Sequence, residues 1–308
     1  MEGNLTDIRQ VCLYLTRQCN IRCHYCKIRK DWSNDMTFEQ IQDAIKIIKN
    51  KIKPELLILF GGEPFLRNDI YEIVQYCNDI GQAYTIISNS TLPVDFDRVK
   101  FQSYTGSIDW LEAPKVKGAI EVKSIAGLEK LREAKKHGVP DVSGNIIISS
   151  KNFEQVPDLV RKLSSEGIWS VLGIVHSGSE NFWKFRSSCD DMVLSREQVN
   201  WISDCLFNLK LEGLLIHNCF EYFRMMRMFY NFSWNCASSG LKYLIVDSDG
   251  SLMACNDIDK GVMRKFKIFD IENEWEAVKV AWHAEVEDCK GCCYNHMVQV
   301  HRSGKLVH

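Results

Sequence analysis

Three cysteines near the N-terminus, Cys19, Cys23 and Cys26, lie within eight residues in the spacing Cys-x3-Cys-x2-Cys. Thiolates this close together bind a soft metal centre, because sulfur ligands select zinc, copper(I) or iron–sulfur clusters. A closed structural zinc site needs four ligands, whereas a site with three protein ligands keeps one position open for chemistry. The spacing predicts an open metal site, and a zinc knuckle is the alternative on spacing alone.

Length and charge set broad limits on the function. The 308 residues are enough for one large domain or two unequal ones. The formal net charge of −2 argues against a nucleic-acid partner held by a strongly basic surface. No apolar run is long enough to cross a bilayer, and the N-terminus does not begin a signal peptide. We therefore expect a cytoplasmic protein with no membrane partner.

Thirteen cysteines are many for a cytoplasmic protein, where thiol clusters indicate metal binding or catalysis more often than disulfides. They gather at the two ends of the chain. Five isolated ones are expected to be small buried hydrophobic residues: Cys12, Cys77, Cys189, Cys205 and Cys219.

Short apolar segments alternate with amphipathic ones over the first two thirds of the chain. Strands are expected at 11–16, 56–60, 83–88, 102–109, 145–149 and 169–175. Between them, apolar residues at helical spacing mark helices at 41–48, 70–77, 125–134 and 156–163, with Thr37 and Ser124 as N-caps. Six strand–helix units by about residue 210 predict an α/β fold, a partial (β/α)6 TIM-like barrel with a parallel sheet.

The pattern changes in the last third. A helix is expected at 195–211, and the Met- and aromatic-rich segment 220–232 is expected to be a core helix. Segments 241–246 and 251–255 flank a tight turn and predict a hairpin. We therefore expect two domains: 1–210 as the barrel core, and 211–308 as a small cysteine-rich β-hairpin/helix domain.

A second motif, Gly61-Gly62-Glu63-Pro64, directly follows the second expected strand. Strand ends meet at the face where parallel α/β enzymes bind ligands, so this turn should lie beside the cysteine loop. Glycines let the backbone approach a ligand closely. A carbonyl-rich turn with a carboxylate can receive a ligand's ammonium group.

Together these motifs resemble the radical S-adenosylmethionine (radical SAM) superfamily. Its signature Cys-x3-Cys-x-aromatic-Cys is present with Tyr25 at the aromatic position, and Gly-Gly-Glu-Pro is intact. The resemblance implies a [4Fe–4S] cluster on Cys19, Cys23 and Cys26, with S-adenosylmethionine on the fourth iron. Residues 61–64 would receive its amino group, and Tyr25 would lie near its adenine.

Further positions resemble the family less specifically. Ser88 and Asn89 end a strand where relatives place ribose contacts, although Ser90 stands where a glycine is usual. The remaining candidates are Ser107 and Asp109 of a Ser-x-Asp strand end, and Lys123 as a basic partner for the methionine carboxylate. A polar strand end or a solvated lysine explains each of these positions equally well.

The resemblance also implies the chemistry. An all-thiolate cluster can reach the low potential that sulfonium cleavage needs. Cleavage would give methionine and a 5′-deoxyadenosyl radical, which abstracts a hydrogen from the substrate inside a shielded barrel mouth. An external low-potential donor such as flavodoxin or ferredoxin would supply the electron.

The C-terminal cysteines resemble the auxiliary-cluster domains of the same superfamily, called SPASM in the longer form and twitch in the shorter. The ligands implied for a second [4Fe–4S] cluster are Cys236, Cys255, Cys289 and Cys292. No cysteine follows Cys293, so the shorter form is the better match. Cys293 or His296 could replace Cys292, and a four-thiolate zinc site is the alternative.

With four protein ligands the second cluster would have no open iron, and its natural role would be to accept an electron from the substrate radical. We therefore expect a radical SAM oxidoreductase acting on a small molecule such as a sugar or cyclitol. A peptide-modifying maturase is the alternative. With only 18 residues before Cys19, it would need a partner protein for leader recognition. The molybdenum-cofactor cyclase is disfavoured because its Gly-Gly tail is missing. A non-catalytic zinc or electron-carrier protein would have no use for residues 61–64.

Overall fold

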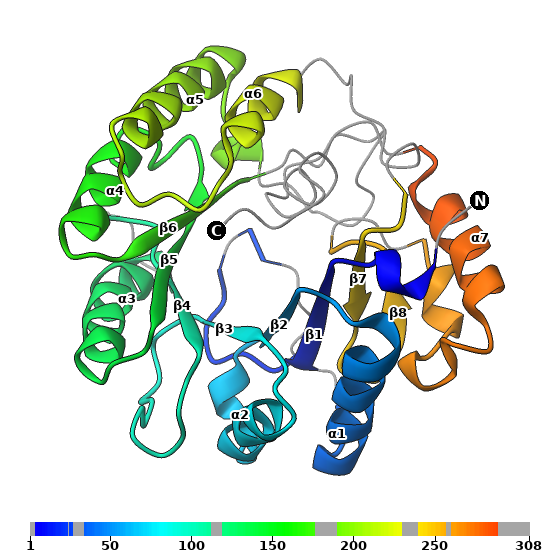
Figure 1. The fold of residues 1–308 in the computed structure, drawn as a ribbon. Helices are drawn as coiled ribbons and strands as arrows, with labels where there is room; N and C mark the ends of the chain where they lie inside the picture. The colour runs from blue at the N-terminus through cyan, green and yellow to red at the C-terminus, as the bar shows by residue number, and fades with distance from the viewer. Residues whose placement is uncertain are drawn as a thin grey trace.

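A computed structural model describes residues 4–23, 25–26, 34–111, 119–175, 190–229, 240–256 and 260–288. Its centre is a curved eight-stranded sheet in the order β6-β5-β4-β3-β2-β1-β7-β8 (Figure 1). The strands are β1 (Gln10–Thr16), β2 (Leu56–Gly61), β3 (Tyr84–Ser88), β4 (Ser103–Ser107), β5 (Asp141–Ile148), β6 (Trp169–Ile174), β7 (Tyr243–Val246) and β8 (Leu252–Met253). Strands β1 to β6 pair in parallel, which confirms the expected partial barrel.

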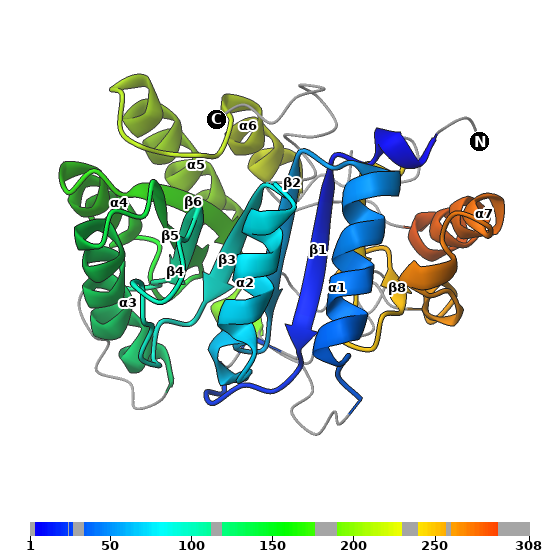
Figure 2. The same cartoon turned by 60° about the horizontal axis from the view of Figure 1, so that its bottom comes forward.

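Helices cover the outer face of this sheet, and in Figure 2 α1 and α2 lie over β1 and β2. The helices are α1 (Phe38–Ile47), α2 (Ile70–Asp79), α3 (Ala119–Lys136), α4 (Val156–Ser165), α5 (Arg196–Leu211), α6 (Phe220–Phe229) and α7 (Trp275–Val286). The apolar face of α1 is buried through Ile41, Ala44 and Ile45, as its spacing predicts. Within the described residues, no helix is both long and apolar enough to span a membrane.

Helix ends follow local side-chain chemistry in one case and depart from it in another. Thr37 caps α1 as expected: its hydroxyl accepts the backbone N–H of Gln40, whose side chain accepts the N–H of Thr37. The expectation for Ser124 is wrong, because α3 begins at Ala119 and runs through this serine. Serine before an apolar run is a common N-cap, but the residues from Ala119 onward also tolerate a helix, so the helix starts earlier.

The C-terminal hairpin extends the barrel sheet. Strand β7 pairs in parallel with β1, from Gln10 opposite Tyr243 to Leu13 opposite Val246, and β8 returns antiparallel to β7. Segment 220–232 is a core helix where the structure describes its side chains, since Tyr222, Phe223, Met225 and Met226 of α6 are buried. A domain boundary at residue 210 stays a prediction, and the hairpin shares its backbone hydrogen bonding with the barrel.

Candidate functional site

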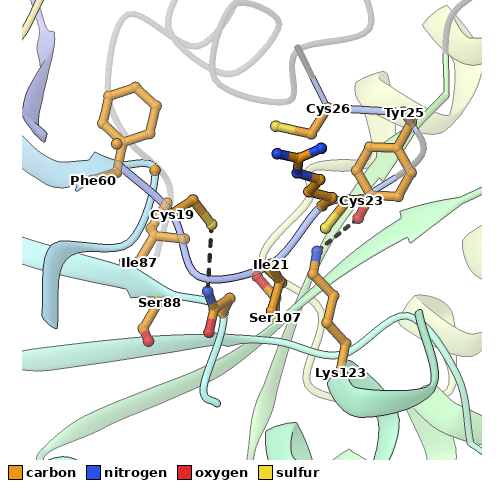
Figure 3. A pocket seen from close by; sticks show the side chains of 14 residues that line it. Cys19, Ile21, Cys23, Tyr25, Cys26, Phe60, Ile87, Ser88, Ser107 and Lys123 are labelled. Atoms are coloured by element: carbon orange, nitrogen blue, oxygen red, sulfur yellow. Dashed lines mark hydrogen bonds between the residues drawn. The ribbon is translucent and has the colours of Figure 1, made fainter. Parts of the chain in front are cut away.

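A cavity of about 420 Å³ lies where the first strands of the sheet end (Figure 3). Cys19, Cys23 and Cys26 all line it, together with Gly61, Gly62 and Lys123. Small-ligand pockets are typically about 300–1,000 Å³, so the volume suits a cofactor of modest size. The structure therefore brings the two sequence motifs to the wall of one cavity.

The cysteine loop leaves the end of β1 and presents its thiols to this cavity. Cys19 and Cys23 are partly exposed, Cys26 is exposed, and the backbone N–H of Cys26 donates to the carbonyl of Cys23 at 3.0 Å. Among the described residues, no three cysteine, histidine or carboxylate side chains converge within range of a single metal ion. Three accessible soft donors on one loop nevertheless fit an iron–sulfur cluster by ligand type.

Burial raises the pKa of the Cys23 thiol, and the nearby Lys123 ammonium acts in the opposite direction. A cation beside a thiol favours the thiolate, which is the form that binds metal.

The glycine pair is needed for contact with the cysteine loop. Gly61 has φ +148°, and a Cβ there would lie 2.2 Å from the carbonyl oxygen of Thr16; at Gly62 it would lie 2.0 Å from that of Gln18. The backbone N–H of Gly62 donates to Thr16 and that of Glu63 to Gln18, both at 2.8 Å. Any side chain at either glycine would separate the turn from the loop that carries the cysteines.

Glu63 is fully buried and does not line the cavity. Its Oε1 accepts the hydroxyl of Ser88 at 2.9 Å and the N–H of Phe65 at 3.1 Å, and its Oε2 accepts the N–H of Asn89 at 2.7 Å. Burial raises the pKa of Glu63, and these hydrogen bonds lower it in part. The carboxylate thus joins the ends of β2 and β3, and only the backbone of the turn faces the cavity. Pro64 is buried and opens a short 3-10 turn, Pro64–Leu66.

The turn after β3 explains how serine replaces the usual glycine at position 90. Ser90 has φ +63°, in the left-handed region that favours glycine. Its backbone N–H donates to the Ser88 hydroxyl at 2.9 Å, and its own hydroxyl lies 3.0 Å from that of Tyr104. These bonds hold the less favourable conformation in place.

Tyr25, Asp109 and Lys123 form a hydrogen-bonded group, and two of them, Tyr25 and Lys123, line the cavity. The Tyr25 hydroxyl donates to Asp109 Oδ2 at 2.7 Å and accepts from Lys123 Nζ at 2.8 Å, and Nζ lies 3.5 Å from Asp109 Oδ2. Burial raises the pKa of Tyr25, and the Asp109 carboxylate adds to the rise. Burial opposes the charge of Lys123, but Asp109 and Tyr25 together hold its pKa well above the ordinary value. The Lys123 side chain therefore stays a charged ammonium group at the cavity wall. The adenine and carboxylate roles stay predictions.

Three residues support the cysteine loop without having been indicated by the sequence: Arg17, Asp247 and Arg264. Arg17 Nε donates to Asp247 Oδ1 at 2.7 Å, and its Nη2 also contacts this carboxylate. Arg264 Nη1 donates to Asp247 Oδ2 at 2.6 Å. Asp247 is fully buried and lies 230 positions from Arg17 along the chain, so no local pattern could pair them. The hairpin turn therefore anchors the segment that enters the cysteine loop.

The second cysteine group is described only at Cys255, which follows β8 and is partly exposed. Its neighbour Asn256 accepts a hydrogen bond from the Tyr14 hydroxyl of β1 at 2.7 Å. Cys236, Cys289 and Cys292 lie outside the described residues, so the auxiliary ligand set stays a prediction.

Comparison with known proteins decides the family. The family model described as the Radical SAM superfamily matches residues 13–192, more than half of the chain. The protein belongs to the radical SAM superfamily. Membership implies a [4Fe–4S] cluster and S-adenosylmethionine, the group that the three thiols of the cavity fit by ligand type.

Curated relatives match part of their own length. An AdoMet-dependent heme synthase of Nitratidesulfovibrio vulgaris is 26% identical over 248 residues, which cover 74% of this chain and 64% of the relative. A pre-heme d1 synthase of Dinoroseobacter shibae is 29% identical over 182 residues, 54% of this chain and 44% of the relative. The matched region therefore spans between 44% and 64% of these two relatives.

Solved radical SAM structures share the fold. Streptococcus suis SuiB bound to S-adenosylmethionine superposes with a TM-score of 0.71 at 11% identity, covering 94% of this chain and 74% of SuiB. Native anSMEcpe with bound AdoMet and a peptide has a TM-score of 0.65 at 16% identity, covering 94% and 87% of the two chains. At these identities the likeness describes the architecture alone.

Proposed function

We propose that this radical SAM enzyme cleaves S-adenosylmethionine reductively and oxidises a small-molecule substrate, with a second [4Fe–4S] cluster accepting the electron. The observation that supports this most directly is that the three thiols and the Gly61-Gly62 turn line one cavity. An external low-potential donor such as flavodoxin or ferredoxin supplies the electron in this proposal.

When bound at Cys19, Cys23 and Cys26, the cluster and S-adenosylmethionine supply the 5′-deoxyadenosyl radical that abstracts a substrate hydrogen. The chain's own residues bind S-adenosylmethionine and shield the radical from water. Carbonyls of the Gly61-Gly62 turn accept from an ammonium group, and the Lys123 ammonium attracts a carboxylate. Phe60 and Ile87 contribute apolar wall, which limits water around a reactive species.

The inner wall beyond this cavity favours a small polar substrate. Ser107 lines the cavity, and Asn145 is its register partner on β5, on the same face of the sheet. Within the described part of the chain, neither side chain has a hydrogen-bond partner, and Asn145 is partly exposed. A hydroxyl and an amide side by side can bind the hydroxyl groups of a sugar or cyclitol.

The auxiliary cluster is assigned in this proposal to Cys236, Cys255, Cys289 and Cys292, within a C-terminal domain of residues 211–308. A fully ligated cluster can accept an electron but cannot bind substrate through iron, so it suits a net two-electron oxidation. The bond from Tyr14 to Asn256 supports a location near the barrel, because it places the residue after Cys255 beside β1.

Peptide modification is a second candidate, supported by structures of SuiB bound to its precursor peptide SuiA and of anSMEcpe with peptide. The two candidates separate on substrate size. Product formation from a polyol, with no turnover of peptides, supports the first.

The test is anaerobic reconstitution with iron and sulfide, followed by reduction in the presence of S-adenosylmethionine. Two clusters require about eight irons per chain, and 5′-deoxyadenosine should be released. Cys19→Ala, Cys23→Ala and Cys26→Ala should each abolish that release. Cys255→Ala should retain cleavage while product formation fails; normal turnover by this variant would contradict the electron-acceptor role.

A further inference from the structure

Asn89 lies between the two signature motifs and contacts both. Its side-chain Nδ2 lies 3.7 Å from the Sγ of Cys19 and 2.9 Å from the Oδ1 of Asn20. Its backbone N–H donates to Glu63 at 2.7 Å. Asn89 is only 6% exposed, so a polar side chain here needs defined partners.

The hydrogen-bond network fixes which end of the amide faces the sulfur. Asn89 Oδ1 accepts from both the backbone N–H and the hydroxyl of Thr91, at 2.9 and 2.6 Å. A backbone N–H can only donate, so the atom that receives it must be the oxygen. The nitrogen consequently points at Asn20 and Cys19, and its two hydrogens are both used. Neither hydrogen remains for another acceptor.

We propose that Asn89 donates a hydrogen bond to the Cys19 thiolate and raises the reduction potential of the cluster bound there. This rests on the cluster assignment of the proposed function. Reduction adds negative charge to the cluster and its sulfur ligands. An N–H donor at a ligand sulfur stabilises that charge, and hydrogen bonds to sulfur are among the factors that set cluster potentials. Asn89 is therefore a positioning and tuning residue that connects Glu63 to Cys19.

The test is an EPR-monitored redox titration of the reconstituted full chain, following the reduced-cluster signal that S-adenosylmethionine perturbs. Asn89→Leu removes the donor, and Asn89→Asp replaces it with an acceptor. Both should shift the midpoint potential to more negative values, with the larger shift in Asn89→Asp. The matched control is Asn78→Leu, whose amide bonds to Lys100 and Gln102 at 2.7 and 3.0 Å away from the cysteine loop, and it should leave the potential unchanged.

An unchanged potential in both Asn89 variants at full iron content would overturn the inference. If these variants fail to bind iron, the wild-type protein decides. With asparagine labelled by ¹⁵N in the side chain, pulsed EPR of the reduced cluster should detect a nitrogen coupling, and its absence would overturn the inference. Failure of the wild type to assemble a cluster or to release 5′-deoxyadenosine would instead contradict the proposed function.

Discussion

Two fully buried carboxylates, Glu63 and Asp247, hold the cysteine loop from opposite sides, and their partners differ in charge. Glu63, after β2, accepts hydrogen bonds from a hydroxyl and two backbone N–H groups, all of them neutral. Asp247, after β7, binds the guanidinium groups of Arg17 and Arg264. The first carboxyl group has only neutral donors around it, behind the turn of Gly61 and Gly62, and the second is paired with guanidinium groups at the entry to the cysteine loop.

Because their partners differ, Glu63 and Asp247 should respond differently to removal of the carboxylate charge. A carboxylate held by neutral donors can lose its charge and keep several bonds. A carboxylate that binds the buried guanidinium of Arg17 and the partly exposed one of Arg264 loses both ionic contacts when its charge is removed.

The largest effect is expected for Asp247→Asn. It leaves two guanidinium groups facing a neutral amide, and breaking a buried ion pair costs about 3–5 kcal/mol. Urea unfolding of the metal-free protein at pH 7 measures the loss. The control is Asp249→Asn in the same turn, where loss of a partly exposed ion pair with Lys267 should cost less than about 1 kcal/mol.

The coupling between Arg17 and Asp247 can be tested by a double substitution. Arg17→Met combined with Asp247→Leu should cost less than the sum of the two single changes, because both single changes remove the same contact between Arg17 and Asp247. Additive costs would show that the ion pair does not dominate this side of the loop.

Glu63→Gln should be milder, at about 1–3 kcal/mol. The shape is preserved, but the amide nitrogen replaces an oxygen that accepts a hydrogen bond, leaving one buried donor without an acceptor. Chemical unfolding of both proteins measures the difference. Glu55→Gln, at a partly exposed ion pair with Arg9, is the matched control with a smaller cost. Equal losses of stability in Glu63→Gln and Glu55→Gln would show that burial of Glu63 does not increase the cost of replacing it.

Glu63 also predicts a pH dependence. Its pKa is raised by burial above the unfolded value of about 4.3, so the folded state favours the protonated form. This contribution is complete below about pH 4.3 and is lost as the pH rises through the folded pKa. The stability advantage of wild type over Glu63→Gln should therefore shrink as the pH rises above about 4.3 in unfolding curves recorded at a series of pH values. An advantage that grows with pH would contradict the assignment.

The smallest effect is expected at the exposed pair of Arg132 and Glu166, which joins α3 to the end of α4 at 2.7 Å. Hydrogen bonding to Arg132 lowers the pKa of Glu166 to about 2. Its contribution is present above the unfolded pKa of about 4.3 and is lost as the pH falls toward about 2. Solvent screening limits the effect, so Glu166→Gln should cost less than about 1 kcal/mol at pH 7 by chemical unfolding. A larger loss would show that surface pairing rivals the buried contacts.

The sequence predicted the barrel well because its strands are continuous apolar runs and its helices carry one apolar face. The ends of the strands and helices were predicted less accurately. Strand β5 begins at Asp141, four residues before the expected 145, because its partly polar start lacks the apolar signal. Ser124 marks no helix start, since a single capping residue is a weak signal when the residues before it also accept a helix.

At the site, the sequence located the motifs but not the orientation of their side chains. Gly61 and Gly62 were expected to let the backbone approach a ligand closely. The structure shows that they also let it approach the segment that leads into the cysteine loop. The turn of residues 61–64 was expected to receive a ligand's ammonium group, and the structure shows that the Glu63 carboxylate in it points inward toward Ser88 and Asn89. A carboxylate in a turn can face either way, and only the packing of the neighbouring strand selects one.

What the sequence determined by itself is the cysteine loop with its three thiols and the glycine turn, because ligand type and short spacing are local properties of the chain. The tertiary structure decided what holds them: β7 beside β1, Asp247 against Arg17, and Asn89 against Cys19. These contacts join residues about 70 to 230 positions apart. Their partners are selected by strand order and register, which depend on how the whole core packs and leave no pattern in any short stretch of sequence.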